Sequence, residues 1–173
     1  IRKTKKQLVD IGMKNKDFSW LNLHKNISNI FTRTYEAWSN EDMSEVKNYV
    51  NNWYWQNQQL VVLDKWKSEN VKNICNLESI KKIKPLYIEI SDEENFKYSK
   101  IAVLITASIE DYLVNRDTYK IVKGGRGYIN ESHIWIMEYD GKNWLLDNIA
   151  DEDYSLVYLK TKNLIPEKLL SSI

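Results

Sequence analysis

The stretch from His133 to Ile149, HIWIMEYDGKNWLLDNI, decides the fold of this chain. Two apolar runs rich in Trp, Ile and Leu flank Asp140-Gly141, and an Asp-Gly pair between such runs is a strong signal for a β-hairpin with a two-residue turn. Both faces of the hairpin would be largely apolar, so we expect it inside a sheet with helices covering one face. The turn predicts three cross-strand pairs: Met137 with Trp144, Trp135 with Leu146, and Ile136 with Leu145.

Length and charge place the chain among ordinary soluble domains. It has 173 residues, 28% of them charged, with a formal net charge of +1. That balance gives no case for a nucleic-acid partner. No apolar run reaches the roughly 18 residues of a membrane span. Because the sequence begins at Ile1 without a Met, we expect any membrane attachment to come from a region upstream of it.

The first sixteen residues carry most of the local positive charge, with Asp10 as their single acid. We predict a basic, weakly structured and poorly amphipathic lead-in over 1–16, followed by a single domain over 17–173. The lead-in is either a solvated tail or a juxtamembrane segment attracted to anionic lipid. Its membrane-proximal basic residues would be Arg2, Lys3, Lys5 and Lys6.

Helices are predicted first along the chain. From Asp17 or Ser19, either of which can cap a helix, apolar residues recur at helical spacing for about six turns. A second helix would carry Met43, Val46, Tyr49, Val50 and Trp53. A third would cover Gln58 to Lys67. Its inner face would be formed by Leu60, Leu63 and Trp66.

Strands are predicted for most of the remaining chain. Segments 74–80 and 86–90 are rich in β-branched residues and lie on either side of Pro85, and 96–114 places apolar residues at odd positions from Ile101 to Leu113. A short apolar segment over 156–159 and a last helix from Pro166 follow the hairpin. Helices followed by antiparallel strands indicate an α+β fold. We expect three N-terminal helices on a strongly curved, mainly antiparallel sheet of about four strands, a cone fold.

The order of these segments resembles the Tim-forty-four-like domain. The resemblance rests on DFSWLNLHKNISNIFTRTYEAWSNEDMSEVKNYV, IAVLITASIEDYLVN and ESHIWIMEYDGKNWLLDNI, which span about 17–149. This is the C-terminal domain of the mitochondrial inner-membrane import subunit and of bacterial relatives, with a fold related to nuclear transport factor two. Its most specific features here are Ala37-Trp38 followed by Asp42, Asp111-Tyr112, Glu131 before Trp135, and Trp144 followed by Leu146 and Ile149.

The resemblance implies a non-catalytic protein- or lipid-binding module of a membrane-associated protein. The mitochondrial member tethers a chaperone to the translocase and contacts anionic lipid, so the expected partner is a membrane surface or a membrane-embedded protein, in a bacterial envelope. Two alternatives stay open. One is a small cone-fold isomerase or hydrolase with Asp111 as general base and a Tyr such as Tyr35 as acid. The other is an inner-membrane scaffold domain of a secretion system, which a genomic neighbour encoding secretion components would favour.

Asp111 is the most informative polar residue. It shares the apolar face of its predicted strand with Ile109 and Leu113, where an ionised carboxylate is costly unless it is paired. It is either a general base or ligand anchor in a central cavity, or a structural residue. In the second case a β-bulge turns it outward, or Tyr112, Arg116 or a Trp N–H bonds to it.

Aromatic residues are the other candidates for a cavity. Trp53 begins the run Trp53-Tyr54-Trp55, which would form either a ligand mouth, an interfacial anchor or a plug for the open end of the core. A lipid or a small apolar ligand would fit a cavity of this kind. Four further aromatic residues are expected either to line the cavity or simply to pack between helix and sheet: Tyr35, Trp38, Trp135 and Trp144.

No cofactor or metal site is predicted. His24 and His133 lack metal-ligand spacing, and one cysteine, Cys75, cannot complete a zinc site or an internal disulfide. A Cys75–histidine nucleophile pair has no support in the sequence. The run from Gly124 to Gly127 is either an anion-binding loop clamped by Arg126 or a flexible turn.

Overall fold

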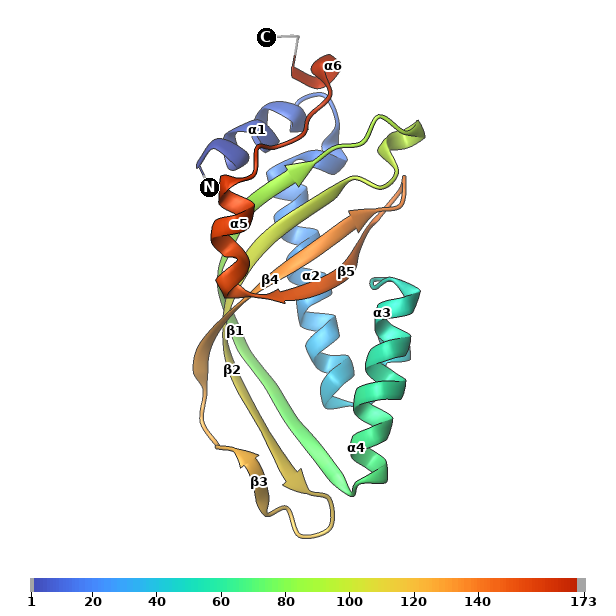
Figure 1. Ribbon diagram of the computed structural model, residues 1–173, viewed down its shortest axis with the longest axis vertical. Helices are drawn as coiled ribbons and strands as arrows, with labels where there is room; N and C mark the ends of the chain where they lie inside the picture. Colours follow the sequence, from blue (N-terminus) through green and yellow to red (C-terminus); the bar gives the residue numbers. More distant parts are fainter. Residues whose placement is uncertain (1, 171–173) are drawn as a thin grey trace. The chain divides into compact units, whose positions relative to one another are not determined.

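The fold is α+β, as predicted. The computed structural model describes residues 2–170, and the side chains of Arg2 and Leu170 lie outside the described part. The helices (Figure 1) are α1 Arg2–Gly12, α2 Trp20–Ser39, α3 Asn52–Asn57, α4 Asp64–Ser68, α5 Ser155–Lys160 and α6 Glu167–Leu170. The strands are β1 Val71–Glu89, β2 Lys100–Asn115, β3 Ile121–Gly124, β4 Ile129–Tyr139 and β5 Trp144–Asp151. Single turns of other helix types are η1 Lys16–Phe18, η2 Met43–Val46, η3 Gln58–Leu63, η4 Glu94–Phe96 and η5 Glu152–Tyr154.

The described strands form one antiparallel sheet of five strands. Their order is β1-β2-β4-β5, and β3 pairs with β2 beside this path. The sequence predicted about four strands, because the exposed residues of β3 carry no alternating pattern. The two segments predicted around Pro85 are one strand, β1. Since β1 ends the strand order, Pro85 can lie within it without breaking a central ladder.

The chain divides into two compact units that interleave in sequence. Unit 1 comprises the described residues of the segments Ile1–Ser28, Lys82–Ile105 and Ser132–Ile173. Unit 2 comprises Asn29–Lys81 and Thr106–Glu131. The long elements α2, β1, β2 and β4 each contribute residues to both units, so each unit is described by itself below.

The predicted two-residue hairpin turn is wrong, although the hairpin exists. Tyr139 pairs with Trp144 and Met137 with Leu146, so both positions differ from the predicted register. The loop is longer because Asp140 organises it: its carboxylate accepts hydrogen bonds from the Lys142 and Asn143 backbone N–H groups at 2.8 and 2.6 Å. A side chain that bonds to backbone groups beyond it stabilises a wider turn than the dipeptide alone predicts.

The prediction of a weakly structured, poorly amphipathic lead-in is also wrong. Residues 2–12 form α1, and Thr4, Leu8 and Ile11 are buried within unit 1. Their spacing places them on one helix face. Burial of Leu8 and of Ile11 stabilises the folded state by about 1.5–3 kcal/mol each, which is why a segment so rich in lysine is helical.

The long helix α2 confirms the predicted apolar stripe. The Ser19 hydroxyl accepts a hydrogen bond from the Asn22 backbone N–H at 3.2 Å and caps the helix, as expected of this residue type. The next predicted helix is wrong, because Met43–Val46 is only a 3-10 turn and Trp53 belongs to α3.

The third predicted helix exists within a longer helical run. Residues 52–68 are helical throughout, with α3, the π-helical turn η3 and α4 in succession. Its predicted inner face is partly wrong. Leu63 is buried, but Leu60 is 67% exposed. The π-helical turn over Gln58–Leu63 changes the angular spacing of the side chains, so a uniform helical period assigns Leu60 to the wrong side.

In β2 the alternation predicted from the sequence holds as far as Ile109. The odd positions from Ile101 to Ile109 are buried, and Asp111 is exposed. Beyond it, the register with β3 shifts between Leu113 and Val114, and Val114 rather than Leu113 is buried. A β-bulge of this kind moves the buried face by one residue.

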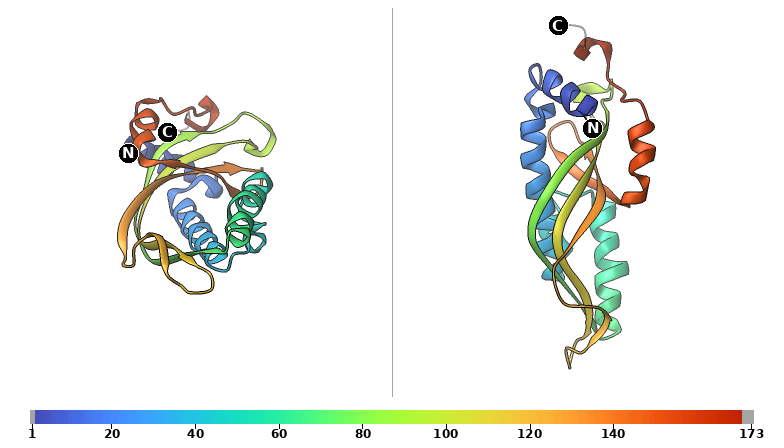
Figure 2. Two further views of the ribbon diagram at one scale, coloured as in Figure 1. Left: turned by 60° about the horizontal axis from the view of Figure 1, so that its bottom comes forward. Right: turned by 90° about the vertical axis from the view of Figure 1, so that its left-hand side faces the viewer.

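Unit 1 has apolar layers on both faces of its strands. Leu86, Ala102 and Ile134 are buried under α5, whose Tyr158 ring lies 6.0 Å from Tyr87. The right-hand view of Figure 2 shows α5 and the first turns of α2, which both belong to unit 1, on opposite sides of these strands. The short helices α5 and α6 confirm the apolar segment at 156–159 and the helix predicted after Pro166.

Candidate functional site

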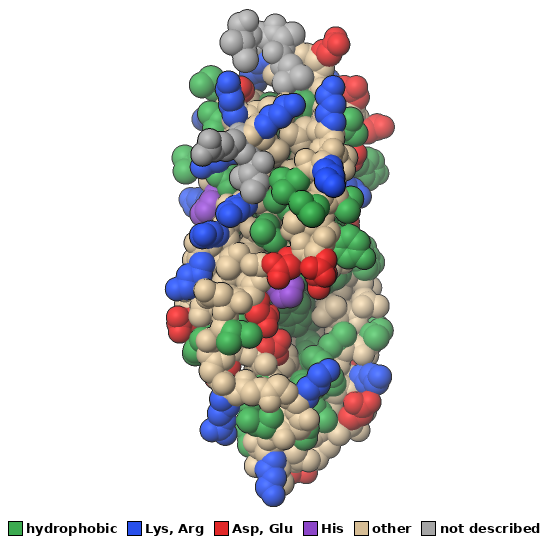
Figure 3. All heavy atoms as spheres, turned by 60° about the vertical axis from the view of Figure 1, so that its left-hand side comes forward, with side chains coloured by type: hydrophobic (Ala, Val, Ile, Leu, Met, Phe, Trp, Pro, Cys, Tyr) green, Lys and Arg blue, Asp and Glu red, His purple; other side chains and the backbone are tan. Residues whose placement is uncertain are grey.

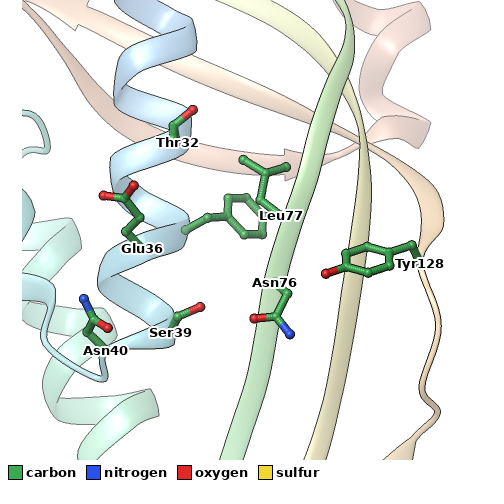
Figure 4. Close-up of a pocket in the computed structure, with 8 residues that line it drawn as sticks. Thr32, Glu36, Ser39, Asn40, Asn76, Leu77 and Tyr128 are labelled. Atoms are coloured by element: carbon green, nitrogen blue, oxygen red, sulfur yellow. The ribbon is translucent and has the colours of Figure 1, made fainter.

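A polar pocket of about 320 Å³ lies in unit 2. Seven of the eight described side chains that line it carry a hydrogen-bonding group, and among them Glu36 alone carries a charge. Figure 4 shows the last turns of α2 on one side and β1 on the other, with the Tyr128 ring reaching in from the segment before β4. The lining residues are Thr32, Tyr35, Glu36, Ser39, Asn40, Asn76, Leu77 and Tyr128.

Hydrogen bonds hold the walls of this pocket together. The Ser39 hydroxyl donates to the Cys75 carbonyl oxygen and joins the end of α2 to β1. The Glu110 carboxylate accepts from Asn76 Nδ2 at 3.1 Å and from the Gly127 backbone N–H at 2.7 Å, so the segment before Tyr128 is bound to the strands. Gly127 has a φ of 109°, which favours glycine at this position.

Tyr35 is the buried wall of the pocket. Its side chain is 8% exposed, and its ring lies 4.8 Å from Phe31 and 5.1 Å edge-to-face from Trp38. Burial is the largest cause that raises the pKa of Tyr35 far above its ordinary value. Negative charge at Glu131 and Asp111 raises this pKa further.

Cys75 lies in the same neighbourhood and is 4% exposed. Burial raises the pKa of the Cys75 thiol to about 12, with smaller contributions from Asp111 and Glu131. The thiolate is the nucleophilic form of cysteine. At neutral pH this side chain is therefore a buried thiol that packs in the core of unit 2.

Asp111 is solvent-exposed, so the desolvation cost expected from its strand position does not arise. In the amide orientation that satisfies both side chains, Asn73 Nδ2 donates to Asp111 Oδ1 at 2.7 Å and to the Tyr112 carbonyl oxygen at 3.1 Å. The β-bulge of β2 comes after Asp111, and Arg116 pairs with Glu41 instead. A role for Asp111 in ligand binding stays a prediction.

The predicted aromatic residues fall into the two units. Tyr35 and half-buried Trp38 belong to unit 2, as does Trp53, which is 54% exposed and packs edge-to-face on Tyr54 at 5.4 Å. Trp135 and Trp144 belong to unit 1, where they are 1% and 4% exposed.

Trp144 has a clear structural part in unit 1. Its indole N–H donates to the Asp17 carbonyl oxygen at 2.9 Å. Its ring lies 5.6 Å from Phe18 and 5.1 Å from Tyr139. Of the two roles expected of Trp144, cavity lining and packing, these contacts correspond to packing. They attach the turn after α1 to the hairpin.

The outer face of α1 is a second candidate surface. Lys6 and Val9 lie opposite the buried stripe, Lys5 lies exposed beside them, and Met13 follows just beyond the helix. Val9 is 47% and Met13 84% exposed. Figure 3 shows Lys and Arg side chains close together on the upper part of the face it draws, where α1 and α5 lie. The predicted basic residues Lys3, Lys5 and Lys6 are exposed, and the Arg2 side chain lies outside the described residues.

Sequence reasoning missed Glu36, Asn76 and Tyr128. Glu36 is one of several charges on α2, while Asn76 and Tyr128 come from segments that meet only in the folded chain. None of these positions has a motif that could have identified it. The buried face of α1, in contrast, had a signal in the helical spacing of Thr4, Leu8 and Ile11.

Within residues 2–170, no three His, Cys, Asp or Glu side chains gather closely enough to hold a metal ion. None of the helices described there is both long and apolar enough to cross a membrane.

Comparison with known protein families finds no match, and comparison with curated proteins finds none either. Among solved structures, the chain has a weak likeness in fold to the intermembrane space region of the chloroplast protein ARC6. The TM-score is 0.47 at 6% sequence identity, over 73% of this chain and 93% of that one.

Proposed function

We propose that this chain is a non-catalytic binding module of a membrane-associated protein, and that α1 contacts the membrane surface. The observation that carries the proposal is the outer face of α1, where Lys5 and Lys6 lie beside exposed Val9 and Met13. A helix that combines basic residues with exposed apolar side chains suits the boundary between lipid headgroups and acyl chains. The finer expectation of a Tim-forty-four-like cone fold belongs to this proposal.

The expected attachment is weak and salt-dependent. Each basic residue near an anionic surface contributes about 1 kcal/mol, and the attraction falls off within a Debye length. Val9 and Met13 would add burial of apolar surface, which salt does not screen. The inner stripe of Leu8 and Ile11 is used by the core of unit 1, so it is not available to lipid.

Vesicle co-sedimentation tests the proposal with substitutions rather than truncation, because removal of α1 would also remove Leu8 and Ile11 from the core of unit 1. We expect the wild-type chain to bind anionic vesicles, to bind neutral ones less, and to dissociate as salt rises. The double variant Lys5→Gln/Lys6→Gln should lose most of this binding. Val9→Ser should weaken it at high salt as well.

The matched control is Lys47→Gln/Lys120→Gln, which removes the same charge from exposed positions of unit 2. It should bind vesicles like the wild type. If the control loses as much binding as the α1 variant, attraction by total charge explains the data and α1 is not the membrane contact. If the wild type binds neither vesicle, the membrane proposal fails.

The enzyme alternative has less support from the geometry. A general acid works best with a pKa near the operating pH, and burial raises the pKa of Tyr35 well above its ordinary range. Asp111 would have to act as base from an exposed position. Asp111→Asn tests this alternative, since loss of a binding or catalytic property at unchanged melting temperature would favour it.

The unit 2 pocket favours a second candidate function, binding of a cationic group of a partner protein. Glu36 lines the pocket, and Glu110 is bonded to its wall residue Asn76. This lining suits a guanidinium or ammonium group better than the small apolar ligand expected from the sequence. A titration with N-acetyl-arginine amide, followed by backbone amide NMR shifts, should move the signals of Asn40 and Asn76.

The same titration has a charge control. Glu36→Gln should abolish those shifts, whereas Glu94→Gln, an exposed change in unit 1, should leave them in place. Equal shifts in both variants would mean that the arginine derivative does not use the pocket.

A further inference from the structure

Unit 1 contains a cavity of about 270 Å³ whose chemistry is opposite to that of the unit 2 pocket. Among the described residues that line it, three carry positive charge and none carries negative charge. The lining residues come from the start of α1, from Leu86 of β1, and from the end of α5 with the segment after it. The polar ones are Lys3, Thr4, Lys160, Thr161, Lys162 and Asn163.

The inner wall of this cavity is preformed. Asn163 Nδ2 donates to Thr4 Oγ1 at 3.0 Å and to Gln7 Oε1 at 2.6 Å, while Asn163 Oδ1 accepts from the Ile88 N–H at 3.0 Å. Thr4 is 3% exposed. Because Asn163 is bound on three sides, the segment from Lys160 to Asn163 has a defined path against α1.

Backbone bonds continue this attachment. The Leu164 N–H donates to the Ile88 carbonyl oxygen at 3.1 Å, and the Ile90 N–H donates to the Leu164 carbonyl oxygen at 2.8 Å. Lys160 and Lys162 are thus carried by a segment that is held on the edge of β1. This segment is already ordered in the folded chain, so a ligand that binds there does not have to order it. Binding therefore loses less conformational entropy.

The lysines of this cavity have no acidic partner among the described residues. None of the ion pairs among the described residues includes Lys3, Lys160 or Lys162. Three positively charged residues line one cavity, and a bound anion would offset the repulsion between them. An ammonium binds phosphate as a point charge and is a common ligand for it in proteins.

We propose that the cavity formed by Lys3, Lys160 and Lys162 binds a phosphomonoester group. A dianion matches three positive charges better than the single charge of a phosphodiester does. The group belongs either to a soluble phosphate compound or to a lipid headgroup. The lipid source rests on the proposed membrane function, and the soluble source does not.

The soluble arm of the test uses glycerol 3-phosphate as phosphomonoester and dimethyl phosphate as phosphodiester, followed by backbone amide NMR shifts. Glycerol 3-phosphate should shift the signals of Thr161 and Asn163 at millimolar concentration, and dimethyl phosphate should bind much more weakly. Lys160→Gln/Lys162→Gln should weaken binding about tenfold or more, since it removes two of the three positive charges that line the cavity.

Two controls locate the effect. Lys5→Gln/Lys6→Gln lies on the outer face of α1, and Lys47→Gln/Lys120→Gln lies in unit 2; both should leave the affinity for glycerol 3-phosphate unchanged. Equal weakening in all three variants would overturn the proposal, because it would indicate general attraction of anions. Absence of shifts in the wild type would overturn it as well.

The lipid arm compares vesicles of phosphatidic acid with vesicles of phosphatidylglycerol at matched surface charge. A lipid source predicts preference for phosphatidic acid, and Lys160→Gln/Lys162→Gln should lose the preference while keeping salt-sensitive binding through α1. If glycerol 3-phosphate binds and vesicles do not, the cavity proposal stands for a soluble ligand and the membrane function fails. If vesicles bind without preference and glycerol 3-phosphate does not bind, the membrane function stands and the cavity proposal fails.

Discussion

Arg116 and Glu41 form a bidentate ion pair in unit 2. Arg116 Nη1 donates to Glu41 Oε1 at 3.0 Å and Nη2 donates to Glu41 Oε2 at 2.6 Å, while Nη2 also donates to the Val71 carbonyl oxygen at 2.9 Å. Glu41 follows α2 with a φ of 57°, in the left-handed region that non-glycine residues seldom adopt. The pair therefore holds the turn after α2 against the ends of β1 and β2.

Replacement of this guanidinium should destabilise the fold. Arg116→Lys retains the charge but cannot donate two parallel hydrogen bonds, so we expect a loss of about 1–3 kcal/mol in the free energy of unfolding. Urea denaturation measures this loss. Arg126→Lys, at an exposed position of the same unit, should change it by less than about 0.5 kcal/mol. Equal effects at both positions would contradict the role assigned to the pair.

The same pair predicts how stability depends on pH. The hydrogen bonds from Arg116 hold the pKa of the Glu41 carboxyl below its usual range, although burial acts in the opposite direction. A carboxyl whose pKa is lower in the folded state stabilises the fold above its unfolded pKa of about 4.3. That stabilisation is lost as the pH falls through the folded value.

Glu41→Gln should consequently lower stability at pH 7 and flatten the decline below about pH 4.5. Urea midpoints between pH 3 and pH 7 measure both effects. Glu94→Gln, an exposed change in η4, should leave the shape of the curve as in the wild type. A parallel acid-side decline in wild type and Glu41→Gln would show that the pair does not contribute to it.

Phe18 connects the turn after α1 to the aromatic core of unit 1. Its ring is fully buried and lies 5.5 Å from Phe96, 5.3 Å from Tyr139 and 5.6 Å from Trp144. Phe18→Ala should cost about 3–5 kcal/mol, and Phe18→Leu, which leaves a smaller cavity, should cost clearly less. A loss below about 1 kcal/mol for Phe18→Ala would mean that residues near the N-terminus contribute little to the core.

Cys75 should react slowly in the folded chain. Burial raises the pKa of its thiol to about 12, and the side chain is 4% exposed. At pH 7.5 we expect iodoacetamide to label the native protein far more slowly than the protein unfolded in urea. The rate in the native state should follow the frequency of opening. Equal rates in the two states would require an exposed, reactive thiol.

Asn163 should govern the stability of α1 as well as the phosphate cavity. Asn163→Ala removes its bonds to Thr4 and Gln7 and leaves the Ile88 N–H without its acceptor. We expect a loss of about 1–3 kcal/mol and faster hydrogen exchange in α1. Asn48→Ala, at an exposed turn position, is the control. Unchanged exchange in α1 would contradict the coupling.

Local periodicity predicted a large part of this fold. The stripe from Trp20 to Trp38 gave α2, the alternation from Ile101 to Ile109 gave most of β2, and the apolar runs around Asp140-Gly141 gave the last two strands. These patterns arise because one face of each helix or strand is buried and the other is not. The pattern is the same whichever part of the protein covers the buried face, so it can be recognised from the sequence alone.

The remaining features depend on groups that the chain brings together only on folding. The register of the hairpin follows from backbone bonds to Asp140. The helix α1 depends on the burial of Leu8 and Ile11 in unit 1, and Thr4 on the same helix bonds to the Leu86 carbonyl oxygen and to Asn163. Neither pocket could be predicted, since each joins segments far apart in the sequence. Spacing along the chain therefore determined the α+β class, the main helix and the main strands. Only tertiary contact decided which polar and charged side chains share a cavity, because burial and the distance between charges depend on position in space.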